Sequence, residues 1–224
     1  MSELEENAMS DIYDEENKRA KLNFISAFFN DLDLKIKFLI ELADSGHRDE
    51  AFLLSCCYID WLGLGFWPNE GSYSRFVKVL RQYGGEEVFS YIHPKMLEEA
   101  LAKLRGKWAG LFLKKVLPIL QQSRVKIYNE YDMIVLLSPR LTTGEQAKIK
   151  DHLWRGTLAA IVYSKIRSPA VHEFGALDVS FDNTTFRGCP VPTINFQMLH
   201  NCLKRIANAA REKSLSTEKW FGHA

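Results

Sequence analysis

Apolar residues recur at three- and four-residue steps near both ends of this 224-residue chain. The first such segment covers residues 11–43, and its apolar stripe consists of Leu22, Ile25, Phe28, Phe29, Leu32, Ile36, Leu39 and Ile40. The second follows a capping residue, Asn195, and its stripe consists of Leu199, Cys202, Leu203, Ile206 and Ala210. This spacing puts the stripe on one face of an α-helix, which needs other helices to bury it. The sequence therefore predicts an all-α helical bundle.

The interior of the chain adds further predicted helices. Residues 47–64 are apolar on most sides, which is typical of a helix at the centre of a bundle. Shorter helices are expected over 72–83 and 95–104, the second opened by His93–Pro94. Thr142 and Glu145 have the spacing of a capping box and predict one helix over 144–166.

Three segments are less regular. Gly106, Gly110 and Pro118 weaken any helix through 105–117. Residues 131–137 are apolar and fit either a strand or a helix. Leu177–Phe181 and Thr184–Arg187 flank a turn at Asp182–Asn183, so a small β hairpin is expected before the last helix.

Composition indicates an ordinary globular protein, with 46% hydrophobic and 25% charged residues. We expect an acidic N-terminal extension over 1–20, one helical domain over 21–214 and a C-terminal tail over 215–224. The first sixteen residues hold seven acids and no Lys or Arg, so no secretory signal is expected. No apolar run is long enough to span a bilayer. Four cysteines without a C-x-x-C spacing suggest reduced thiols in a cytoplasmic protein.

Several catalytic motifs are absent, including the P-loop, the Rossmann turn, the H-E-x-x-H zinc motif and the G-x-S-x-G elbow. One constellation remains, Arg167 followed by Ser168, Pro169 and then His172. A guanidinium matches phosphate oxygens, and an imidazole exchanges protons near neutral pH. This pair suits RNA cleavage without a metal, with the ribose 2′-hydroxyl as nucleophile. Chance alone gives such a spacing about once in a chain of this composition, so a surface Arg and a structural His remain the alternative.

The segment from Lys165 to Phe174 resembles the "R, polar residue, x-x-x-H" signature of the HEPN superfamily. The apolar segment Ala51–Leu62 is similar to the central helix of some members, and the resemblance extends over 22–213. It implies a HEPN-like helical bundle, a homodimer and a metal-independent endoribonuclease, in a toxin–antitoxin or antiviral defence setting. It also implies RNA as substrate, an antitoxin or regulatory protein as a further partner, and no cofactor.

The resemblance implies that Arg167 and His172 are the catalytic pair, with Ser168 and Glu173 supporting their geometry. Two positions depart from the family: Ser168 stands where Asn is frequent, and Phe174 stands where some toxins carry a Tyr. HEPN domains without catalytic activity also exist. The alternative is therefore a non-catalytic helical module that dimerises and binds nucleotide, RNA or a protein partner.

Two further features carry charge. Asp60 is expected to point into the bundle, where it either orients Arg167 or His172 or forms a structural ion pair with another residue. Residues 100–129 contain basic residues and no acid, with Trp108 and Phe112 interleaved, so they form either an RNA-binding surface or a solvated face above core aromatics. The basic residues are Lys103, Arg105, Lys107, Lys114, Lys115, Arg124 and Lys126. No histidine pair has metal-binding spacing, so no metal site is expected.

Overall fold

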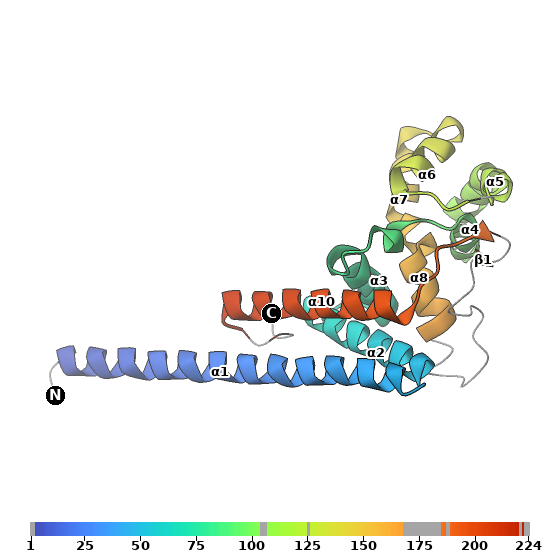
Figure 1. The fold of residues 1–224 in the computed structure, drawn as a ribbon. Helices are drawn as coiled ribbons and strands as arrows, with labels where there is room; N and C mark the ends of the chain where they lie inside the picture. Colours follow the sequence, from blue (N-terminus) through green and yellow to red (C-terminus); the bar gives the residue numbers. More distant parts are fainter. Residues whose placement is uncertain are drawn as a thin grey trace.

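The computed structural model describes residues 3–103, 107–124, 126–167, 185–186, 189–219 and 221. These residues are predominantly helical, as predicted. Figure 1 shows an elongated molecule, with the long first helix extending beyond the last one and the middle helices gathered at the other end.

Three long helices form the first part of the fold. They are α1 (Glu3–Asp44), α2 (Arg48–Phe66) and α10 (Phe196–Thr217). The helix α2 packs against both others, and α1 runs antiparallel to α10 (Figure 1). This confirms the central place predicted for the apolar helix. The helix α1 starts at Glu3, eight residues before the predicted start, so most of the expected acidic extension belongs to it.

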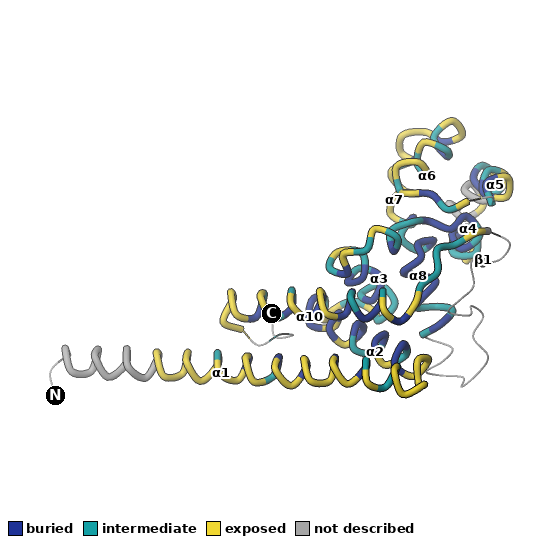
Figure 2. The backbone as a smooth tube through the Cα atoms, viewed as in Figure 1, coloured by how far each residue is buried: buried dark blue, intermediate teal, exposed yellow. Residues whose placement is uncertain are grey.

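The same core continues through α3 (Ser72–Tyr83) and α8 (Leu158–Ile161), which leads directly into the π-helical segment η4 (Val162–Arg167). The 3₁₀ helix η1 (Glu87–Ser90) follows α3. Figure 2 shows buried residues gathered in α2, α3 and α8. The stripe predicted for the last helix is buried throughout.

A second hydrophobic cluster lies among four shorter helices. These are α4 (Pro94–Ala102), α5 (Lys107–Gln122), α6 (Glu130–Leu137) and α7 (Thr143–Leu153). The 3₁₀ helices η2 (Ser138–Arg140) and η3 (Trp154–Gly156) follow α6 and α7. The capping box of Thr142 and Glu145 is present, and the His93 side chain caps α4.

Extended backbone at Ile92 lies where the second cluster meets the first. Ile92 exchanges backbone hydrogen bonds with Tyr128 and forms a second bridge with Thr157. The amide of His93 donates to the carbonyl of Gly156 at 2.8 Å. These bonds hold the chain between η1 and α4 against the chain that enters α8.

One helix prediction was wrong, and one segment that was expected to be a weakened helix is a continuous one. The helix α5 runs through Gly110 and Pro118, because the burial of Val116 and Leu120 against the second cluster offsets the cost of the proline. The helix expected over 144–166 is interrupted at η3, where Thr157 takes an extended conformation and caps α8. The ambiguous segment 131–137 is helical, within α6.

Two short strands, β1 (Thr185–Phe186) and β2 (Cys189–Pro190), pair antiparallel before α10. The predicted hairpin around Asp182–Asn183 lies almost entirely outside the described residues, and its first strand wholly so. The pair contains only β1 and β2, so each strand is an edge strand. An edge strand tolerates a proline such as Pro190.

Candidate functional site

Asp60 occupies the inward face of α2, where only 5% of its surface is exposed. The start of α3 and the end of η4 both lie against this part of α2. Burial of a carboxylate is costly unless charged and hydrogen-bonding partners satisfy it. The surrounding elements supply three such partners.

The carboxylate of Asp60 accepts hydrogen bonds from two guanidinium groups and one hydroxyl. Arg167 donates through Nη2 to Oδ2 at 2.6 Å, and Arg75 donates through Nε to Oδ1 at 3.1 Å. The hydroxyl of Ser72 donates at 2.7 Å to Oδ2 and lies 2.9 Å from Oδ1. The side chains of Arg167 and Arg75 are 14% and 18% exposed, so both ion pairs are largely shielded from water.

The charges in this group do not cancel. Among the described residues, two permanently charged guanidinium groups share this one carboxylate, which leaves one net positive charge. A positive charge in a poorly solvated place attracts an anion more strongly than the same charge in water. The group formed by Asp60, Arg75 and Arg167 therefore favours an approaching phosphate or carboxylate.

Arg167 also contacts the aromatic ring of Tyr163, one turn earlier in η4. Its guanidinium lies over that ring at 5.1 Å from the centroid, and Nη1 is 3.5 Å from the hydroxyl. Its Nε is buried and has no hydrogen-bond partner in the described part of the chain. Arg167 thus keeps donors that Asp60 does not use. A π-helical turn such as η4 often marks a functional position.

Two cysteines lie near this group on α2. Burial raises the pKa of the Cys57 thiol, and the Asp60 charge adds to that rise while Arg167 opposes it. Burial raises the pKa of Cys56 more strongly. Both thiols are free and stay protonated near neutral pH, so neither offers a thiolate nucleophile beside Arg167.

A cavity of about 360 Å³ lies on the other side of Tyr163. It is lined by Tyr73, Met96, Glu99, Ala100, Lys103, Arg155, Tyr163, Ser164 and Lys165. These residues come from α3, α4 with the residue that follows it, η3 and η4. The cavity therefore lies next to the Asp60 group, with Tyr163 common to both.

The predicted catalytic residues are only partly within the described chain. Arg167 and Asp60 are brought together, which agrees with the orienting role expected for Asp60 and equally with a structural ion pair that includes Arg75. Ser168, His172 and Glu173 lie outside the described residues.

The basic residues of 100–129 are dispersed over several environments. Lys115 pairs with Glu145, and Arg124 pairs with Glu98. Lys126 lies over the ring of Tyr128, and Lys114 is exposed on α5. Lys103 lines the cavity. Arg105 is outside the described residues, and for Lys107 only the helical backbone is described.

Sequence reasoning missed three members of the site. Tyr163 precedes Arg167 by four residues, so helical spacing could have identified it. Ser72 and Arg75 carry no local signal, because they meet Asp60 only after the chain turns between α2 and α3.

Comparison with family models, with curated proteins and with solved structures gave no match to this chain. Among the helices described, none has both the length and the apolar character needed to cross a bilayer. Within the same residues, no three His, Cys, Asp or Glu side chains are grouped as metal ligands.

Proposed function

We propose that this chain is a metal-independent endoribonuclease of the HEPN type. The observation that carries the proposal is the buried group in which Asp60 holds Arg167 while Arg75 leaves a surplus positive charge. Such a group is suited to stabilise the negative charge that develops on a phosphate during transfer. The resemblance of the segment from Lys165 to Phe174 to the HEPN signature gives the reaction class.

Each residue has a defined role in this reaction. The ribose 2′-hydroxyl oxygen attacks phosphorus and loses its proton, the bond to the 5′ oxygen breaks, and that oxygen takes up a proton. Arg167 binds the phosphate through Nη1, which makes only a long contact of 3.5 Å with the Tyr163 hydroxyl, and Asp60 fixes the guanidinium in place through Nη2. His172 transfers the protons or binds the phosphate as a second ligand, with Ser168 and Glu173 supporting the geometry. The products are a 2′,3′-cyclic phosphate and a 5′-hydroxyl.

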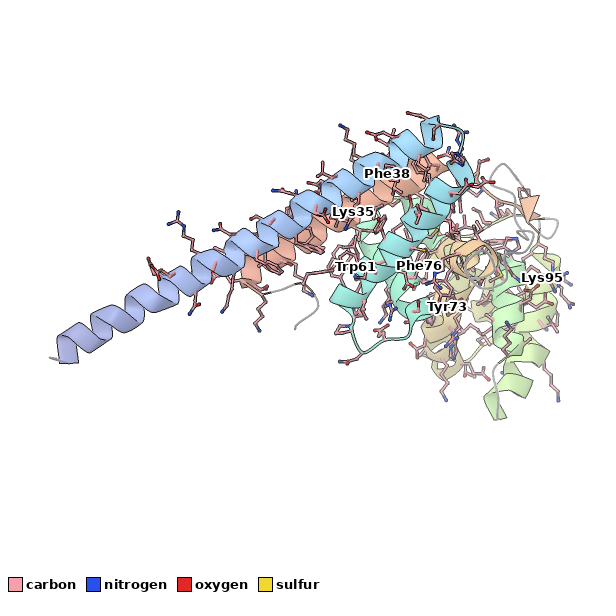
Figure 3. The ribbon with its side chains drawn as sticks, turned by 90° about the horizontal axis from the view of Figure 1, so that it is seen from below. Lys35, Phe38, Trp61, Tyr73, Phe76 and Lys95 are labelled. Carbon is pink, nitrogen blue, oxygen red and sulfur yellow. The ribbon has the colours of Figure 1, made fainter. Side chains whose placement is uncertain are left out.

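The proposal includes a homodimer and a regulatory partner such as an antitoxin. Large apolar side chains exposed on α1 and α2 support an interface, among them Phe24 (63% exposed), Leu34 (67%) and Phe38 (53%). Figure 3 labels Phe38 on α1 and Trp61 on α2, and neither helix contributes a described residue to the lining of the cavity. A dimer formed through this face covers apolar surface and leaves the cavity open.

The non-catalytic alternative also has an observation in its favour. The side chain of Arg167 is largely buried and bound to Asp60, as in a structural ion pair. In that case the chain is a helical module that dimerises and binds nucleotide, RNA or a protein partner. The two functions differ in whether RNA is cleaved.

The test is cleavage of a mixed-sequence fluorescent RNA in the presence of EDTA. We expect wild-type protein to cleave, and His172→Ala to be slower by about 100-fold or more. His47→Ala is the matched control, because His47 is exposed at the junction of α1 and α2, and it should cleave like wild type. Loss of wild-type cleavage in EDTA, or equal cleavage by His172→Ala, rejects the proposed mechanism.

A further inference from the structure

The cavity beside Tyr163 has a size and a wall that fit a small organic anion. Its volume of about 360 Å³ lies within the range of about 300–1,000 Å³ that small-molecule sites occupy. Its lining comes from two parts of the chain that are far apart in sequence, α3 with α4 and η3 with η4, so the fold itself shapes it. Figure 3 shows Tyr73 and Phe76 on the part of α3 that meets the segment of α8 and η4.

Cations dominate the charged side chains of the cavity. Of the described residues that line it, Lys103, Arg155 and Lys165 are cationic and Glu99 is acidic. Among the described residues, neither Lys103 nor Arg155 has a carboxylate partner, and the buried Nε of Arg155 has no hydrogen-bond partner. The guanidinium of Arg155 lies 4.6 Å from the centroid of the Trp154 ring, which restricts its position. Two cations with unused donors favour an anion with several acceptor oxygens.

Two tyrosine rings form part of the wall, together with Met96 and Ala100. The rings of Tyr73 and Tyr163 are 5.3 Å apart, and the ring of Trp154 lies 5.2 Å from that of Tyr73. The hydroxyl of Tyr73 donates to the carbonyl of Arg155 at 3.3 Å, which holds this tyrosine at the wall. Burial raises the pKa of Tyr73 to about 12, so it carries no charge that would repel an anion. Flat aromatic walls next to cations are the combination that binds a base together with its phosphate.

The position of the cavity relative to Arg167 gives it a place in the reaction. Ser164 and Lys165 line it from the same turns of η4 that lead to Arg167. Tyr163 lies between the cavity and the guanidinium of Arg167, which contacts the tyrosine ring. A nucleotide in the cavity and a phosphate at Arg167 would be adjacent units of one RNA strand.

We propose that this cavity binds a nucleoside monophosphate unit, with the base against the tyrosine rings and the phosphate bound by Lys103 and Arg155. This assignment of the ligand rests on the endoribonuclease function proposed above. In that reaction, the bound unit is the nucleotide of the RNA next to the scissile phosphate. The ligand chemistry is shared by a free nucleotide and by a residue of RNA.

Direct binding to the full chain tests the site without requiring cleavage. Titration calorimetry would compare adenosine 3′-monophosphate with adenosine and with inorganic phosphate. We expect the nucleotide to bind more tightly than either fragment. Lys103→Gln and Arg155→Gln should each weaken nucleotide binding by about tenfold, the loss expected for one charge-assisted contact. Lys150→Gln is the control, because Lys150 is an exposed lysine of α7 outside the cavity, and it should bind like wild type.

Circular dichroism confirms that each variant is folded before binding is measured. Unchanged nucleotide binding in both variants, or no nucleotide binding by wild type, overturns the site. If inorganic phosphate binds as tightly as the nucleotide, the proposed contact with the base is wrong and the cavity is an anion site only.

Cleavage assays on the same proteins separate the two proposals. If the cavity binds a nucleotide of the RNA substrate, Lys103→Gln raises the KM for RNA while kcat changes little. If wild type binds the nucleotide and cleaves no RNA, the site stands as one for free nucleotides and the endoribonuclease proposal fails. If RNA is cleaved with unchanged KM in both variants and no nucleotide binds, only the cavity proposal fails.

Discussion

The Asp60 carboxylate has a structural role and, in the proposed reaction, a chemical one. It satisfies Arg75 and Arg167 at once, and the hydroxyl of Ser72 completes its hydrogen bonds. Removing the negative charge would leave two buried guanidinium groups without an anion, which is costly in a poorly solvated place. The stability of the fold and the position of Arg167 therefore depend on the same group.

Replacing Asp60 by asparagine tests this dependence. Asp60→Asn should lower the free energy of unfolding by about 3 kcal/mol, because two ion pairs are lost while the shape is kept. Urea denaturation followed by circular dichroism measures the change. In the control, Asp31→Asn breaks an exposed pair with Lys35 on α1 and should change nothing measurable. Equal stability of the two variants would contradict a central role for Asp60.

His200 is a second residue whose burial has a measurable consequence. It is 1% exposed on α10, and neither ring nitrogen has a hydrogen-bond partner within the described residues. Burial, and then the positive charge of Lys204, lower the pKa of His200. Asp33 and Lys37 of α1 and Arg211 of α10 line the adjacent cavity.

The lowered pKa predicts the direction of a pH effect on stability. The unfolded chain binds a proton at His200 below the ordinary value of about 6.5, whereas the folded chain resists it. The stability associated with neutral His200 is therefore present above that pH and is lost as the pH falls. When the pH is lowered from about 7.5 to about 5.5, the free energy of unfolding should fall less in His200→Phe than in wild type. Parallel pH profiles in thermal unfolding would contradict this expectation.

At the scale of the element, α5 shows packing overriding local preference. Pro118 lies inside the helix and cannot donate a backbone hydrogen bond, and Gly110 adds a flexible residue. The burial of Val116 and Leu120 nevertheless keeps the segment helical. Pro118 and Gly110 therefore lower the stability of α5, and a substitution at either position can remove that loss.

Pro118→Ala should raise the free energy of unfolding by about 1–3 kcal/mol, because it restores a hydrogen bond and relieves the clash of the ring with the preceding turn. Pro118 is exposed, so the change removes little packing. Denaturation in urea gives the difference from wild type. A less stable variant would mean that the proline stabilises the chain by restricting its unfolded state.

At the scale of the whole molecule, the two hydrophobic clusters depend on a close approach between η3 and α4. A Cβ atom on Gly156 would lie 2.7 Å from the Cβ of Leu97 and 3.0 Å from its Cα. Because part of this neighbour is backbone, the clash cannot be relieved by a side-chain rotation alone. The approach also allows the hydrogen bond between His93 and Gly156.

Gly156→Ala should therefore lower the free energy of unfolding by about 1–3 kcal/mol. The matched control is Gly110→Ala, where a Cβ meets no heavy atom within 4 Å and should stabilise α5 by about 0.5–1 kcal/mol. Chemical denaturation of both variants compares them directly. Changes of the same sign would contradict the importance of the η3–α4 approach.

The sequence predicted those features that depend on local patterns. The capping box at Thr142 and Glu145, the cap at Asn195 and the buried stripe of the last helix are all confirmed. It missed the continuity of α5 and the interruption at Gly156, because distant contacts with the second cluster and with Ile92 decide them.

The candidate site likewise has a part that local sequence patterns predicted and a part that depends on tertiary packing. A buried Asp60 was predicted from helical spacing, and pairing with Arg167 was one of its expected alternatives. Arg75 and Ser72 could not be assigned from sequence, since their contact with Asp60 depends on how α3 packs against α2. The cavity beside Tyr163 is also a product of tertiary packing, because four separate elements line it.

The central claim is that Arg167, held by Asp60, stabilises a phosphate that the neighbouring 2′-hydroxyl attacks. Its most direct test is the chemistry of the RNA ends that the wild-type protein produces in EDTA. The account predicts 2′,3′-cyclic phosphate and 5′-hydroxyl ends, with no cleavage of a substrate that carries 2′-deoxyribose at every position. Ends with a 3′-hydroxyl and a 5′-phosphate would contradict it, because they require water as the nucleophile.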